Sequence, residues 1–251
     1  MSIVAATSLT DQIDSVSQNQ LKVAFVAAVV ISVVLPRLPY GRRLLFPFAL
    51  LATWAHELGH GVAAILMGGR FTRLEVYSNL GGTAYSSGVR NGLGRAFVSA
   101  GGLLGPALVG GLIIIAGSRQ ETAPYVLAAV AGSVLVSVVL VLRNQFGLIA
   151  MSIIGLTLAV MAWKGPELVR LLVAQLIGIQ FCLASWGTLD YMFTKNFVRG
   201  DQVINSDTQN ISDELILPYW FWGGCIAGVS ALILASSFYV AWVRPEFAPT
   251  G

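Results

Sequence analysis

Charged residues are scarce in this chain, and histidine is scarcer still. Only 11% of its 251 residues are charged and 56% are hydrophobic, whereas an average soluble domain is about 25% charged. The mean hydropathy is +0.76. A soluble core cannot bury so much apolar surface, so the composition excludes an ordinary soluble domain. It predicts an all-α polytopic membrane protein.

Cysteine and lysine are also rare, and each scarcity excludes a class of protein. The two cysteines, Cys182 and Cys225, lie in apolar runs, which excludes a disulfide framework and a CxxC metal site. The three lysines, Lys22, Lys164 and Lys195, lie at the edges of apolar runs, so none can form an intramembrane retinal Schiff base. The small net charge of +3 is scattered, which argues for lipid head groups as partners and against nucleic acid.

What the sequence does contain is long apolar runs. A membrane-spanning helix needs about 20 such residues, and the chain holds about seven candidate runs, with six as the main alternative. We expect a single membrane domain over 21–243, with a polar tail at 1–20 and a short tail at 244–251. The expected spans are 21–35, 44–67, 95–117, 123–142, 146–163, 168–193 and 218–243.

Two polar segments interrupt the apolar runs. Residues 68–94 are rich in glycine and serine and include the alternating stretch FTRLEVY. Alternation of apolar and polar residues is typical of a strand, so a short β-hairpin-like insertion is predicted there. The second segment, 194–217, is predicted to be a polar loop.

The most informative motif is HELGH, which occupies residues 56–60 inside the second apolar run. His56 and His60 are the only histidines in the protein. Residues four apart lie on one face of a helix, so both imidazoles can bind one Zn²⁺ ion. Glu57 can then act as the general base on a water molecule at the metal. Ionisable groups in a membrane are costly and are usually functional; the alternative is a His–Glu–His face that only hydrogen-bonds to its neighbours.

A catalytic zinc usually has three protein ligands, and no third histidine exists. Asp190 is the predicted third ligand, because it and Glu57 are the only acids within the apolar runs. The alternative for Asp190 is a helix-end carboxylate that reaches water. Asp207 in the polar loop is a weaker candidate. Cys182 is another, although a lone cysteine on an apolar face more often serves packing.

These residues resemble the site-2 protease family of intramembrane zinc metalloproteases. HELGH followed by GVAAILMGGR is similar to the family's first motif, and GGTAYSSG and SAGGLLGPALVGG resemble its compact bacterial branch, which has no PDZ domain. The resemblance covers 50–117. It implies hydrolysis of peptide bonds within or beside the membrane, in a bacterial cell membrane or an organellar membrane of bacterial descent. The family's second motif has Asp followed by Gly, whereas Tyr191 follows Asp190 here and no Asn-Pro precedes it.

Further residues can be assigned roles on this basis. Asn144 and Asn79 are candidate donors to the oxyanion of a tetrahedral intermediate, with satisfaction of backbone groups as the alternative role. Gly101, Gly105 and Gly110 are spaced by four or five residues and should let the third span pack closely on the histidine-bearing helix.

Three functions remain open from the sequence. The first is a zinc endopeptidase acting on a membrane protein, with an exposed strand edge in 71–88 that pairs with an extended substrate; a plain surface hairpin is the alternative for that segment. The second is a non-proteolytic relative serving as a subunit or assembly factor of a membrane complex. The intact Glu57 argues against it, because a structural zinc site does not need that residue. A metal transporter is disfavoured, since polar residues are sparse on the other spans.

Overall fold

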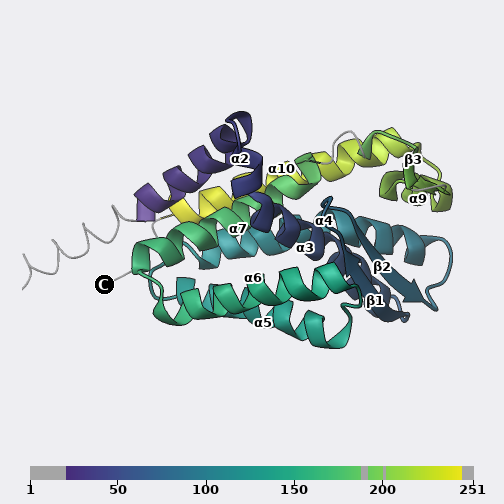
Figure 1. The fold of residues 1–251 in the computed structure, drawn as a ribbon. Coiled ribbons are helices and arrows are strands. Elements are labelled where there is room, and N and C mark those ends of the chain that lie inside the picture. The colour runs from purple at the N-terminus through teal and green to yellow at the C-terminus, as the bar shows by residue number, and fades with distance from the viewer. Residues whose placement is uncertain (1–20, 188–191, 200–201, 245–251) are drawn as a thin grey trace, which may run out of the picture.

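The computed structural model describes residues 21–187, 192–199 and 202–244. Long helices lie side by side along most of the molecule, and the two small hairpins lie at one end of them (Figure 1). Residues 21–34 are helical and lead through the short turns η1 and α2 into the first long helix. The bounds of these elements are η1 Leu35–Arg37, α2 Gly41–Leu44, α3 Phe46–Leu66, α4 Leu93–Ala116, α5 Ala123–Leu140, α6 Gln145–Lys164, α7 Glu167–Gly187 and α10 Tyr219–Trp242.

Five of the described helices are long and apolar enough to cross a membrane: α4, α5, α6, α7 and α10. Each overlaps one of the expected spans. The described part of the first helix, 21–34, is shorter than a span, and α3, which carries the polar HELGH turn, is not among the five. The protein is therefore an integral membrane protein, while the expected count of seven spans is not confirmed.

Glycines bring α3 and α4 into close contact. A Cβ added to Gly59 would lie 2.3 Å from the carbonyl oxygen of Gly101, and one added to Gly105 would lie 3.3 Å from the Cα of Gly59. Such small residues let two helix backbones approach closely. Gly101 and Gly105 thus lie as expected. Gly110 does not, because its added Cβ would lie 2.6 Å from the carbonyl oxygen of Gly178 on α7.

The predicted hairpin insertion is confirmed. Strands β1 (Arg70–Val76) and β2 (Gly82–Ser87) pair antiparallel, with a bulge between Phe71 and Arg73. One face of the hairpin packs on α3: Leu74 and Val76 are fully buried. The hairpin therefore runs back alongside the helix that carries the histidines.

The outer edge of β1 is covered by the turn between α5 and α6. The amide of Leu74 donates to the carbonyl of Val141 (2.8 Å), and the amide of Arg143 donates to the carbonyl of Leu74 (3.0 Å). These bonds form a parallel bridge between Leu74 and Leu142. Among the described residues no strand pairs with the other side of β2.

The segment predicted as a polar loop at 194–217 contains regular structure. Strands β3 (Asn196–Arg199) and β4 (Gln202–Asn205) form an antiparallel hairpin, and α9 (Asp207–Glu214) follows directly. Helix α9 packs on α4 and α10 through the buried Ile211, which shares an apolar cluster with Ala96 and Ile226. Polar composition predicts a loop, but the buried Ile211 gives this short helix an apolar contact with α4 and α10.

Candidate metal centre

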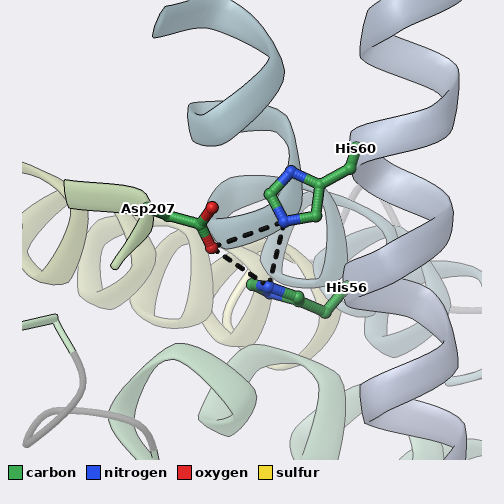
Figure 2. A group of neighbouring side chains, drawn as sticks. All are labelled: His56, His60 and Asp207. Carbon is green, nitrogen blue, oxygen red and sulfur yellow. Dashed lines mark hydrogen bonds and ion pairs between the residues drawn. The ribbon is translucent and has the colours of Figure 1, made fainter. Parts of the chain in front are cut away.

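The two histidines project from neighbouring turns of α3 toward one point. Figure 2 shows both rings on the same side of the helix, facing Asp207. The ring centroids are 4.7 Å apart, and the ring planes are nearly perpendicular. The two Nε2 atoms are 3.1 Å apart. The spacing of four residues therefore produces the predicted pair of converging imidazoles.

Asp207 completes the group from another part of the chain. Its Oδ2 lies 3.2 Å from Nε2 of His56 and 3.4 Å from Nε2 of His60. Asp207 is the first residue of α9, and the N-cap Ser206 accepts a hydrogen bond from the amide of Gln209. Burial opposes ionisation of the Asp207 carboxyl, but the charge of His60 and hydrogen bonds from both imidazoles outweigh it and hold its pKa well below the usual range. A carboxylate, the form that ligates metals, is thus favoured.

The geometry of these three atoms fits a zinc ion. With Zn–N and Zn–O bonds of about 2.0 Å, the ligand atoms of a tetrahedral site lie about 3.3 Å apart. The three observed separations are 3.1, 3.2 and 3.4 Å. Within the described part of the chain, this is the one group of three His, Cys, Asp or Glu side chains whose ligand atoms lie close enough to share a metal ion. Three protein ligands leave a fourth position open, as catalytic zinc sites require.

The orientation of His60 is fixed by α4. Its Nδ1 lies 2.8 Å from the carbonyl oxygen of Val98, and because a carbonyl only accepts, Nδ1 carries a proton. In the neutral tautomer with Nδ1 protonated, the lone pair of Nε2 points toward His56 and Asp207, the direction in which a shared metal ion would lie. Gly102 makes room for the ring, since a Cβ there would lie 2.2 Å from its Cε1 and Nε2 atoms.

Glu57 is buried beside this group. The residue is only 8% exposed, and its side chain packs against the first residue of β2. A Cβ added to Gly82 would lie 2.7 Å from Oε1 of Glu57. The hairpin therefore holds the carboxylate in place from one side, next to the histidine turn.

The predicted ligand Asp190 falls within 188–191, outside the described residues, so its assignment stays a prediction. The sequence favours Asp190 over Asp207, because Asp207 lies beyond the apolar runs, where acids are common. A local signal does mark it: Ser206 followed by Asp207 and Thr208 is a typical helix start, with an acid in the first turn. That pattern predicts the short helix, although it does not show that the helix reaches the histidines.

The two candidate oxyanion donors are both engaged with backbone groups. Asn144 accepts a hydrogen bond from the amide of Val76 (3.1 Å) and donates from Nδ2 to its carbonyl (2.6 Å). Asn79 accepts from the amide of Gly81 (3.0 Å) in the tip of the hairpin. Asn144 thus extends the backbone pairing of β1, and a role in catalysis remains a prediction for both residues.

A known protein family matches most of this chain. The family described as Peptidase M50B-like matches residues 23–237, which include the whole histidine turn and Asp207. Comparisons with curated proteins and with solved structures found no match. Since the family match extends over most of the sequence, the chain belongs to the Peptidase M50B-like family, within the site-2 protease family.

Proposed function

We propose that this protein is an integral membrane zinc endopeptidase that cleaves membrane-embedded or membrane-adjacent proteins. The observation that carries the proposal is the convergence of His56, His60 and Asp207 at the separations of a tetrahedral zinc site. Membership of a peptidase family supports the same activity. A buried glutamate beside the first histidine supplies the base that hydrolysis needs.

In this proposal His56, His60 and Asp207 hold the ion, and Glu57 handles protons. When bound, zinc acts as a Lewis acid that makes water nucleophilic near neutral pH. Glu57 takes a proton from the attacking water as its oxygen adds to the peptide carbonyl carbon. The same carboxyl then delivers that proton to the amide nitrogen as the C–N bond breaks. One water is consumed, and a carboxylate and a protonated amine are released.

The position of the centre suggests where cleavage occurs. His60 contacts Val98, which lies about 8 Å along α4 from its first residue at a rise of 1.5 Å per residue. The apolar layer that a full span crosses is about 30 Å thick. The centre therefore lies closer to one end of α4 than to its middle, and we expect cleavage near one face of the membrane.

The side of β2 that faces away from β1 offers a way to hold the substrate. A helical substrate has its amides bonded internally, so a segment must unwind before attack. Pairing of that segment with β2 would replace its lost hydrogen bonds. Because Gly82 at the start of β2 packs against Glu57, a strand added along β2 would pass close to the base.

The test is the substitution Glu57→Gln in the full-length protein. Loss of a general base typically costs about 10²–10⁴-fold in rate, so cleavage of a co-expressed membrane substrate should fall by that amount. Zinc content should stay as in the wild type, since Glu57 does not bind the metal. Zinc per chain and cleavage are measured on the same purified sample.

The matched control is Glu121→Gln, a glutamate that is exposed between α4 and α5. It should leave both zinc content and cleavage unchanged. Equal activity of Glu57→Gln and wild type would contradict the proposed role. A wild type that carries zinc but cleaves none of a panel of membrane proteins would instead favour the non-proteolytic membrane subunit.

A further inference from the structure

Helix α9 carries a polar contact at each of its ends. Its first residue, Asp207, belongs to the candidate metal centre. Its last residue, Glu214, contacts the start of α4: Oε2 accepts the backbone N–H of Gly92, and Oε1 lies 3.6 Å from Nη1 of Arg95. The helix has 8 residues and is about 12 Å long, so both contacts constrain one short rigid rod.

The helix that Glu214 holds is the same helix that orients His60. The first residues of α4 lie next to Glu214, and the following turns provide the Val98 carbonyl and the space at Gly102 that seat the His60 ring. The carboxylate of Asp207 and the imidazole of His60 are therefore both positioned relative to α4. A shift of α9 along α4 would change the distance between these two groups.

The contact with Gly92 is the stronger of the two that Glu214 makes. The first amides of a helix have no partner within it, and a carboxylate there gains a charge-assisted bond and a favourable dipole. The Glu214 side chain is 19% exposed, whereas that of Arg95 is 60% exposed. An exposed ion pair contributes little to stability, so the backbone contact carries most of the effect.

We propose that Glu214 is a positioning residue of the metal centre: by fastening the end of α9 to the start of α4, it holds Asp207 at zinc-binding distance from His56 and His60. The inference rests on the metal centre of the proposed function, but it makes no use of the peptidase activity.

Other contacts also hold the start of α9, and they set the size of the expected effect. Thr208 donates to the carbonyl of Met192 (2.7 Å), and Ser206 donates to that of Thr194 (2.6 Å). Ile211 is buried between them and Glu214. Loss of Glu214 should therefore make the position of Asp207 less well defined, while the other contacts keep it near the histidines. Outer residues that orient a metal ligand typically contribute about 10–100-fold to affinity, and we expect the lower end of that range.

The experiment measures the zinc dissociation constant of purified full-length variants by competition with a chelator. Glu214→Ala should weaken binding about tenfold, and Glu214→Gln should weaken it less, because its amide oxygen still accepts from Gly92. The control is Asp213→Asn on the same helix, whose carboxylate accepts from Asn205 and Gln209. It should bind zinc as the wild type does.

A second variant tests the same contact from the other side. Gly92 has a φ of +77°, which disfavours any residue with a Cβ, although an added Cβ would meet nothing within 4 Å. Gly92→Ala should therefore turn the N–H away from Glu214 and weaken zinc binding in the same direction.

Cobalt provides a readout that general destabilisation does not change. The visible d–d absorption per bound Co²⁺ reports tetrahedral coordination, so Glu214→Ala should alter the spectrum of the bound ion and not merely the amount bound. Wild-type zinc affinity together with a wild-type cobalt spectrum in Glu214→Ala would overturn the inference. A wild type that binds zinc tightly without cleaving any substrate would contradict the proposed function and leave this inference standing.

Discussion

At the scale of single residues, the candidate metal centre consists of one carboxylate and two imidazoles whose ligand atoms converge. Asp207 is 6% exposed and has both histidines within 3.4 Å. A buried carboxylate without a positive partner would be costly. The same atoms that need a cation here are therefore placed to bind one, and removing any of them leaves the others unsatisfied.

The first prediction compares the two candidate aspartates. Asp207→Asn keeps the side-chain shape but removes the charge. Loss of a residue that only orients a metal ligand typically weakens binding about 10–100-fold. Asp207→Asn should weaken zinc binding by more than this, because a ligand itself is lost. Asp190→Asn is the parallel variant, and chelator competition measures both. Unchanged affinity in Asp207→Asn with loss in Asp190→Asn would restore Asp190 as the third ligand.

At the scale of elements, the close contact of α3 with α4 determines where the His60 ring lies. Gly102→Ala should displace this ring, since the new Cβ would lie 2.2 Å from it. Zinc affinity should fall, while the helical circular dichroism signal stays as in the wild type. The control is Gly132→Ala on α5, where an added Cβ meets nothing within 4 Å. Equal zinc affinity in the two variants would contradict the role assigned to Gly102.

The β1–β2 hairpin is held by a second buried carboxylate. Glu75 is 5% exposed and accepts hydrogen bonds from Arg73, Tyr77 and Tyr85. Burial alone would raise the pKa of Glu75, but the hydrogen bonds from Tyr77 and Arg73 outweigh it and lower the pKa from its ordinary value of 4.5. The folded hairpin therefore favours the ionised form.

This shift predicts how the hairpin responds to pH. A lowered folded pKa stabilises the fold above the unfolded pKa, and the stabilisation is lost as pH falls below 4.5 toward the folded pKa. Hydrogen exchange at 70–87 should accordingly be slow at pH 7 and should show loss of protection in acid, after correction for intrinsic rates. Glu75→Gln should reduce protection at pH 7 and show a weaker pH dependence. A variant with wild-type protection throughout would show that Glu75 contributes nothing.

At the scale of the whole molecule, the two hairpins and α9 lie at one end of the long helices (Figure 1). Helix α6 begins beside β1, where Asn144 contacts Val76, and it ends at Lys164. Its 20 residues extend about 30 Å, the thickness of the apolar part of a bilayer. We therefore expect the two ends of α6 to face opposite sides of the membrane.

Cysteine labelling tests this arrangement. Lys164→Cys and Asn196→Cys should react with a membrane-impermeant maleimide from opposite sides of sealed vesicles. Cys225 is replaced by serine in both variants, and Cys182 is buried. Both positions should react after detergent is added. Labelling of both from the same side in intact vesicles would contradict the orientation of α6.

The sequence by itself determined the parts of this protein that rest on local patterns. The spacing of His56 and His60 specifies a two-imidazole face, the alternation of FTRLEVY specifies β1, and the apolar runs specify the long helices. Each signal is contained in a few turns or one strand, so it is readable without knowing what packs against it.

Only the tertiary structure decided which distant residues meet these local features. Asp207 reaches the histidines because α9 docks on α4, and no local pattern around it records that contact. The covered edge of β1 and the packing of Gly110 on α7 were decided in the same way. Composition and periodicity report which face of an element is buried, but the partner that buries it depends on how the whole chain folds.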